Sequence, residues 1–153
     1  MKTKVLIVDD SAVVRNLMHS ILSSDSSIDV VGSAPDPYIA RDKIVKYNPD
    51  VVTLDVEMPR MDVITFLKKL MKHVPVPGVI VSSLTQKEAI TTMKAFEAGA
   101  IDVIAKPEMD LTKGMEIIAK DIIEKVKIAA TARVKKRIER DEPVSATRRI
   151  ITK

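Results

Sequence analysis

Short apolar runs alternate along the chain with longer segments in which apolar residues recur at helical spacing. The short runs are rich in Val and Ile, which is typical of strands buried on both faces of a parallel sheet. We predict such strands at residues 4–8, 28–32, 51–54, 79–82 and 101–104. Strands that alternate with helices in this way form successive β-α units, and these units predict a parallel sheet.

The longer segments carry apolar residues three and four positions apart, which places them on one face of a helix. Clear examples are Val14, Leu17, Met18, Ile21 and Leu22; Ile64, Leu67, Leu70 and Met71; Ile90, Met93 and Phe96; and Met115, Ile118, Ile122 and Val126. Ser11 is the expected N-cap of the first helix, and Pro35 or Pro37 suits the start of the second. Gly99 is placed to end the fourth helix.

These elements predict one α/β domain, which we expect to span residues 1–130. The expected form is a flavodoxin-like, doubly wound sheet of five parallel strands in the order 2-1-3-4-5, with helices on both faces. On such sheets ligands bind outside the carboxyl ends of the strands, where the strand order reverses between strands 1 and 3. We therefore expect a functional site at that edge.

The net charge of +4 comes from the end of the chain rather than from the predicted domain. Residues 133–153 contain eight Lys or Arg and three Asp or Glu, a charge of +5, which leaves −1 for residues 1–132. A basic tail is able to bind nucleic acid or a membrane surface. This one has no aromatic residues to stack on bases and no apolar stripe for a membrane face. We interpret residues 131–153 as a basic interdomain linker, and expect neither nucleic-acid binding nor membrane insertion.

Three absences in the sequence narrow the class of protein further. The chain contains no Cys, which excludes disulfides and thiolate metal sites. No apolar stretch approaches the roughly 20 residues that span a bilayer. The first residues show no signal-peptide pattern. Together these features favour a cytoplasmic protein.

Polar residues stand at the carboxyl ends of most of the predicted strands. Asp9 and Asp10 close the first strand, and Asp55 closes the third. Ser82 closes the fourth strand, and Lys106 lies just past the fifth. Taken singly, an Asp after a strand is often an N-cap or an Asx-turn, and a Ser or a Lys-Pro there is usually part of a loop. Because all of them fall at the edge where this fold binds ligands, we interpret them as one functional site.

The charges at this site indicate its chemistry. Three carboxylates that converge on one point repel one another and raise each other's pKa unless a cation joins them. Mg²⁺ suits them, because it takes oxygen ligands and is usually held by one or two carboxylates and a phosphate. With a lysine and a hydroxyl nearby, such a site has the parts for phosphoryl transfer. One carboxylate would act as nucleophile, and the cations would neutralise the phosphoryl oxygens.

Three stretches resemble the receiver domains of bacterial response regulators: VLIVDDS at residues 5–11, DVVTLDVEMPRMD at 50–62, and Lys106-Pro107. The resemblance covers about residues 3–128. It implies that Asp55 accepts a phosphoryl group from a phosphohistidine on a sensor kinase. The implied Mg²⁺ ligands are Asp10, Asp55 and the backbone carbonyl of Glu57, with Asp9 acting largely through water, and the implied contacts to the phosphoryl group are Ser82 and Lys106.

Three further stretches are similar to the receivers of the chemotaxis methylesterase family, CheB: EMPRMD at residues 57–62, VSSLT at 81–85 and AIDVIAKP at 100–107. In that family the kinase is CheA, and a linker joins the receiver to a C-terminal esterase that demethylates glutamates of chemoreceptors. The chain contains no G-x-S-x-G nucleophile elbow. We therefore expect it to lack the esterase domain and to catalyse only its own phosphorylation and dephosphorylation.

Two positions depart from the pattern of the receiver family. Val63 stands where receivers usually have Gly, and a positive φ there would displace the loop, because a β-branched residue tolerates it poorly. Val103 replaces a common Tyr or Phe, so no aromatic switch is expected. The signal is instead expected to pass through Ser82 to the start of the fourth helix. The Lys106-Pro107 bond is a candidate for the cis form.

Two other functions share some of these features. A DNA-binding response regulator would have the same receiver, with the basic tail leading into a helix-turn-helix. The SSLT run at residues 82–85 favours the methylesterase family instead. A Mg²⁺-dependent phosphatase with an aspartyl-phosphate intermediate generally uses a D-x-D pair, which Asp55-Val56-Glu57 resembles only loosely.

Overall fold

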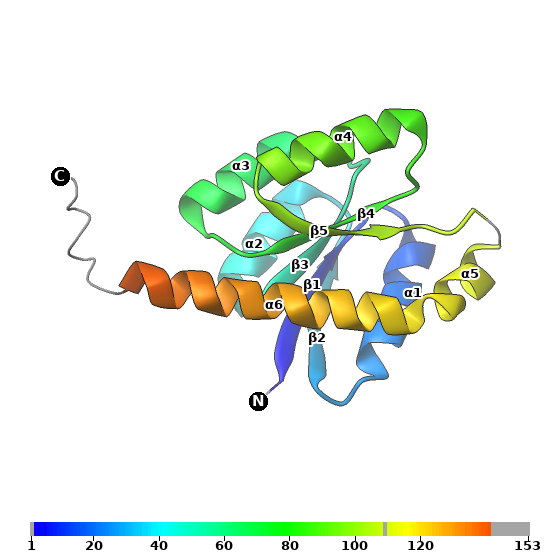
Figure 1. Cartoon of the computed structure of the whole chain (residues 1–153), viewed down its shortest axis with the longest axis horizontal. Coiled ribbons are helices and arrows are strands. Elements are labelled where there is room, and N and C mark those ends of the chain that lie inside the picture. Colours follow the sequence, from blue (N-terminus) through cyan, green and yellow to red (C-terminus); the bar gives the residue numbers. More distant parts are fainter. Residues whose placement is uncertain (1, 109, 142–153) are drawn as a thin grey trace.

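The predicted strands form one parallel sheet, shown in Figure 1. The structure, a computed structural model, describes residues 2–108 and 110–141. The strands are β1 (Thr3–Val8), β2 (Ile28–Ala34), β3 (Val51–Asp55), β4 (Gly78–Ser82) and β5 (Ala100–Ala105). Their order in the sheet is β2-β1-β3-β4-β5, and each neighbouring pair is parallel. The predicted flavodoxin-like topology is therefore confirmed.

Helices cover both faces of this sheet, as a doubly wound fold requires. They are α1 (Ala12–Ser23), α2 (Pro37–Tyr47), α3 (Val63–His73), α4 (Gln86–Glu97), α5 (Leu111–Ile117) and α6 (Ala119–Asp141). In Figure 1, α1 and α6 lie on one side of the strands, and α2, α3 and α4 lie on the other. The sheet is thus the middle one of three layers.

Side chains that alternate along each strand supply both halves of the core. In β1, Val5 and Ile7 pack with residues of α1 and α6, whereas Leu6 and Val8 pack with residues of α2 and α3. Each of these four side chains is at most 1% exposed. Because both faces of the strand are buried, its sequence is a continuous apolar run without polar alternation.

The ends of the helices confirm three expectations from the sequence. The Ser11 hydroxyl accepts a hydrogen bond from the N–H of Val14 at 3.2 Å, as an N-cap does. Pro37 is the first residue of α2, where a missing N–H costs nothing. Gly99 follows α4 with a φ of 122°, which a residue with a Cβ would adopt at a cost. A Cβ there would also lie 2.7 Å from Cγ of Met71.

The end of the chain differs from the predicted pattern. Residues 115–126 were expected to form one helix, but they belong to two helices that are separated at Ile118. The ψ of Ile118 is 11°, outside the helical range, although its N–H still donates to the carbonyl of Gly114 at 3.2 Å. Beyond this residue α6 continues to Asp141. The boundary between domain and linker stays a prediction, and residues 142–153 lie outside those described.

The backbone corrects two local expectations. Val63 is the first residue of α3 and is 1% exposed in the core, with Asp62 as its N-cap. In this loop the positive φ falls on Arg60, at 74°. The loop therefore accommodates a β-branched residue at Val63 without displacement. The Lys106-Pro107 bond is trans, like every peptide bond of the described residues, and trans is the lower-energy form before proline too.

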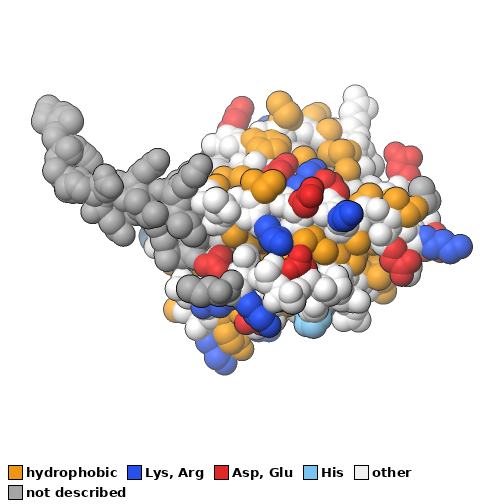
Figure 2. Space-filling model, turned by 60° about the horizontal axis from the view of Figure 1, so that its bottom comes forward, with side chains coloured by type: hydrophobic (Ala, Val, Ile, Leu, Met, Phe, Trp, Pro, Cys, Tyr) orange, Lys and Arg blue, Asp and Glu red, His pale blue; other side chains and the backbone are white. Residues whose placement is uncertain are grey.

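Charged side chains are mixed over the surface of the domain. Figure 2 shows Lys and Arg side chains interspersed with Asp and Glu side chains on the face that it presents. This agrees with the charge of −1 for residues 1–132. None of the described helices is long and apolar enough to cross a membrane.

Candidate functional site

The sheet brings three carboxylates together at its carboxyl edge. β1 and β3 are neighbours, with Val8 beside Leu54, so the residues that end these strands meet at the switch point. Asp9, Asp10 and Asp55 each offer one oxygen, and these oxygens lie within 4.8 Å of one another. Asp9 and Asp55 are 2% and 4% exposed, whereas Asp10 is exposed to solvent. The fold thus buries two acidic groups beside a third that faces water.

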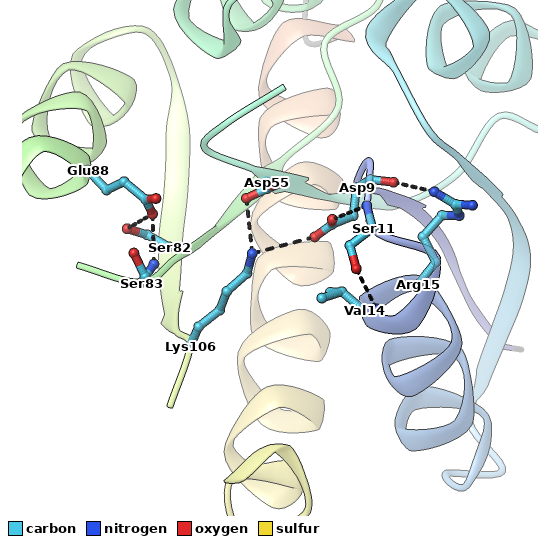
Figure 3. A network of polar contacts seen from close by, with 9 residues as sticks. All are labelled: Asp9, Ser11, Val14, Arg15, Asp55, Ser82, Ser83, Glu88 and Lys106. Atoms are coloured by element: carbon cyan, nitrogen blue, oxygen red, sulfur yellow. Dashed lines mark hydrogen bonds and ion pairs between the residues drawn. The ribbon is translucent and has the colours of Figure 1, made fainter. Parts of the chain in front are cut away.

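Lys106 supplies a positive charge to this cluster. Its backbone N–H donates to the carbonyl of Ser82 at 2.7 Å, which holds the residue beside the end of β4. Its Nζ lies 3.3 Å from Oδ1 of Asp55 and 3.9 Å from Oδ2 of Asp9. Figure 3 shows the ammonium group between these two carboxylates. The pairing offsets part of the cost of removing their charges from water.

The start of α1 holds Asp9 in place. Its Oδ1 accepts a hydrogen bond from the N–H of Ser11 at 2.9 Å, which is an Asx-turn. Its carbonyl accepts from Nη1 of Arg15 at 2.7 Å, and its N–H donates to the carbonyl of Ala34 at 3.0 Å. Oδ2 is left to face Lys106. Asp9 therefore serves both as a turn residue and as a carboxylate of the site.

Burial and mutual repulsion disfavour the ionised carboxylates. Burial and the negative charge of Asp9 raise the pKa of Asp55 to about 6, although Lys106 acts in the opposite direction. Burial also raises the pKa of Asp9, against the hydrogen bond from Ser11 and the charge of Lys106. The positive charge of Lys106 is thus insufficient to offset the effects that raise the pKa values of Asp9 and Asp55. A further cation at this point would favour their ionised forms.

This shift predicts a pH-dependent gain in stability for Asp55→Asn. The folded chain raises the pKa of Asp55 from 3.8 to about 6, so ionisation of this group destabilises the fold above that pH. In buffer without Mg²⁺ at about pH 7.5, we expect the substitution to raise the free energy of unfolding by about 1–3 kcal/mol. The gain should fade as the pH is lowered from about 6 to about 4, where both states bind the proton. Urea unfolding at about pH 7.5 and at about pH 4 measures the gain in stability. An equal gain at both pH values would show that the raised pKa of Asp55 is not its cause.

Ser82 is fully buried at the end of β4, and its hydroxyl is already engaged. Its Oγ accepts a hydrogen bond from the N–H of Leu84 at 3.0 Å, and the hydroxyl donates to Oε1 of Glu88 at 3.4 Å. The same Oε1 accepts from the N–H of Ser83 at 2.8 Å. Figure 3 shows the Glu88 side chain reaching both serines. Glu88 was not predicted as a residue of the site, although it follows Thr85 at the spacing of a capping box.

Two other residues singled out in the sequence lie at the margin of the site. The Glu57 side chain is exposed and lies 4.0 Å from Nζ of Lys87, but the backbone N–H of Glu57 interacts with Asp55 and lowers its pKa. The role of the Glu57 carbonyl as a metal ligand stays a prediction. Val103 is half-buried on β5, where its carbonyl accepts a hydrogen bond from Nζ of Lys125 at 2.7 Å.

The carboxylates have the donor chemistry that Mg²⁺ prefers. Asp9, Asp10 and Asp55 offer hard oxygen ligands close enough to share one small ion. The exposure of Asp10 leaves room for the water molecules that Mg²⁺ retains. Neither His nor Cys takes part in this cluster, which disfavours softer metals. The site is therefore compatible with Mg²⁺ binding.

Comparison with known proteins decides the family. The sequence model of the response regulator receiver domain family matches residues 5–119 of the chain. The chain belongs to the response regulator receiver family. Its structure is similar to the crystal structure of the response regulator domain of Thermotoga maritima CheB, with a TM-score of 0.77 and 38% identity. The similarity covers 86% of this chain and 98% of that one, and the chain is thus a receiver of the CheB type.

Two proteins of similar sequence support the assignment of this chain as a receiver of the CheB type. A protein-glutamate methylesterase/protein-glutamine glutaminase of Sulfurimonas denitrificans is 52% identical over 147 residues, which is 96% of this chain and 42% of that protein. A protein-glutamate methylesterase/protein-glutamine glutaminase 1 of Geobacter metallireducens is 53% identical over 132 residues, 86% of this chain and 36% of that protein. The chain therefore spans about two fifths of the length of these relatives.

Proposed function

We propose that this receiver takes a phosphoryl group onto Asp55 from a kinase phosphohistidine, with Mg²⁺ as cofactor. We also propose that the phosphate regulates a protein-glutamate methylesterase domain on its C-terminal side. The position of Asp55 carries the proposal, because its buried carboxylate lies 3.3 Å from Nζ of Lys106 and shares one site with Asp9 and Asp10. As a nucleophile, Asp55 would act beside one cation and two potential metal ligands, which supports the proposal.

Each residue of the site has a defined part in this transfer. An oxygen of Asp55 bonds to phosphorus while the bond from phosphorus to the donor imidazole nitrogen breaks. Bound Mg²⁺ would neutralise charge on the phosphoryl oxygens. Asp10, Asp55 and the carbonyl of Glu57 would hold that ion, and Asp9 would act on it largely through water. Lys106 exchanges its contact with Asp55 for one with a phosphoryl oxygen, and Ser82 donates its hydroxyl proton to another.

The names of the relatives support the wider assignment. Because they are methylesterases more than twice as long as this chain, we propose that the parent protein carries a C-terminal methylesterase domain. Residues 131–153 would form the linker to it. A CheA-like chemotaxis kinase would supply the phosphate, and chemoreceptor glutamates would be reached indirectly, through the esterase. Such a system operates in the cytoplasm, which is our proposed location.

Two observations weigh against the alternative functions. The relatives described above are methylesterases, which disfavours a DNA-binding response regulator. A phosphatase of the D-x-D type would need an acid beside the nucleophile, but the Glu57 side chain is 58% exposed and faces Lys87. The receiver of a methylesterase is therefore the function that the site and the relatives support best.

Labelling with acetyl phosphate tests the proposal directly. One phosphoryl group per chain should appear when Mg²⁺ is present, and removal of the ion with a chelator should prevent it. Peptide mapping should place the group on Asp55. Equal labelling without Mg²⁺, or an adduct on another residue, would show that the proposed chemistry is wrong.

Asp10→Ala should weaken Mg²⁺ binding by at least about tenfold, because even residues that only support metal ligands cost that much when removed. Isothermal titration with Mg²⁺ measures the loss. Asp29→Ala is the matched control, since Asp29 is an exposed aspartate on β2. It lies beside Lys4 of β1 in the strand register, near the opposite edge of the sheet. If Asp10→Ala bound Mg²⁺ as tightly as this control, Asp10 would not be a ligand.

A further inference from the structure

The Ser82 hydroxyl has one proton and two competing acceptors for it. Because a carboxylate only accepts, the 3.4 Å contact with Oε1 of Glu88 uses the serine proton. In the proposed phosphorylated state the same proton serves a phosphoryl oxygen. Ser82 is 0% exposed, so its hydroxyl depends on acceptors within the protein rather than on solvent. The phosphoryl group and Glu88 therefore compete for this hydroxyl.

The start of α4 places Glu88 for this competition. Its Oε1 accepts from the N–H of Ser83 at 2.8 Å, and its own N–H donates to Oγ1 of the N-cap residue Thr85 at 3.3 Å. The bond to Thr85 is an N-cap contact, whereas the side chain reaches past the N-cap to Ser83, so both ends of the residue are anchored. Burial raises the pKa of Glu88, but the hydrogen bonds from Ser83 and the charge of Lys106 outweigh it and hold that pKa below its usual value. Glu88 is thus a fixed anion at neutral pH.

The contact with Ser82 is the weaker of the two that Glu88 makes. Its 3.4 Å exceeds the usual range for O–H···O bonds, whereas the 2.8 Å contact with Ser83 is short. The Ser82 hydroxyl can therefore break its contact with Glu88 while the N–H of Ser83 keeps the Glu88 side chain in place. Movement of Ser82 would also release Leu84, whose N–H bonds to Ser82 and whose φ of 59° is costly for a residue with a Cβ.

We propose that Glu88 is a positioning residue that binds the Ser82 hydroxyl to α4 and thereby opposes phosphorylation. A phosphoryl group must displace Glu88 from Ser82, and this loosens the turn at Leu84 that leads into α4. The inference rests on the proposed phosphorylation of Asp55 and adds the residue that regulates it. Leu84 is 45% exposed, so the change reaches the surface of the domain.

Beryllofluoride, which imitates the phosphoryl group, provides the test in the presence of Mg²⁺. Its affinity is measured by fluorine NMR titration. Glu88→Gln should bind it about three- to tenfold more tightly than the unsubstituted chain, because hydrogen bonds to charged groups are roughly twice as strong as neutral ones. Glu88→Ala should bind at least as tightly, with thermal unfolding to check that the variant is folded. Glu97→Gln, at the exposed end of α4, removes the same charge away from Ser82 and should change nothing.

The same titration in chains that carry Ser82→Ala decides whether the effect passes through the hydroxyl. There Glu88→Gln should alter the affinity by less than about twofold, because its partner is already gone. A gain of equal size with and without Ser82 would overturn the role of Glu88, and so would no gain at all in the otherwise unsubstituted chain. If the unsubstituted chain itself failed to bind beryllofluoride, the proposed phosphorylation would be refuted instead.

Discussion

Asp55→Asn will abolish the uptake of phosphate from acetyl phosphate. Asparagine keeps the shape of the side chain, but its amide oxygen is a poor nucleophile and brings no charge to a metal ion or to Lys106. Asp9 is a poor substitute, because Ser11 holds one of its oxygens at 2.9 Å and the other faces Lys106. We therefore expect labelling, followed by intact-mass spectrometry, to fall below detection.

The stability of the variant separates this result from misfolding. Because ionised Asp55 destabilises the fold at neutral pH, Asp55→Asn should be at least as stable as the unsubstituted chain. An unlabelled but well-folded variant thus isolates the lost nucleophile. Asp29→Asn removes an exposed aspartate of β2 and should label normally. Full labelling of Asp55→Asn would show that another residue is the nucleophile.

Lys106→Ala will leave Mg²⁺ binding nearly intact but will weaken the response to the phosphoryl group. The Lys106 ammonium lies 3.3 Å from Asp55, where it is placed to contact a phosphoryl oxygen after transfer. Loss of one charge-assisted hydrogen bond should weaken beryllofluoride binding by about 10- to 100-fold. Mg²⁺ affinity should stay within about threefold, because the metal is held by oxygen ligands and not by the lysine.

Two titrations of the same variant, with Mg²⁺ and with beryllofluoride, check this split. Amide NMR shifts of residues 82–88 report whether the start of α4 still responds at saturation, and in Lys106→Ala we expect little response. Lys113→Ala, an exposed lysine in α5, is the matched control and should behave like the unsubstituted chain. Equal losses of both affinities would show that Lys106 serves the metal site as a whole.

Most of the fold could be predicted because it depends on local patterns. The strands are continuous apolar runs since both of their faces are buried, and Ser11, Pro37 and Gly99 act at helix ends through their own backbone chemistry. The break at Ile118 could not be predicted. Apolar residues continue at helical spacing on both sides of it, and the pattern does not report the ψ of 11° at this residue.

The acidic site was predictable for a topological reason. Parallel strands end at one edge, so the residues that follow the adjacent strands β1 and β3 must be neighbours, and those that follow β4 and β5 lie farther along the same edge. Distances and burial were not predictable in this way. That Lys106 pairs with two carboxylates, and that burial raises the pKa of Asp55 to about 6, depends on how the loops close over the strand ends.

The sequence by itself determined the topology of this protein, the set of residues at the switch point and several helix ends, because each follows from periodicity, from the rules of parallel sheets or from the chemistry of single residues. Only the tertiary structure decided how the polar groups share their hydrogen bonds. Val63 fits the loop because Arg60 takes the positive φ. Glu88 engages Ser82 because the start of α4 lies beside the end of β4, and the spacing between Thr85 and Glu88 along the chain does not specify this contact. Such pairings depend on the directions of side chains in space, which the order of residues along the chain does not specify.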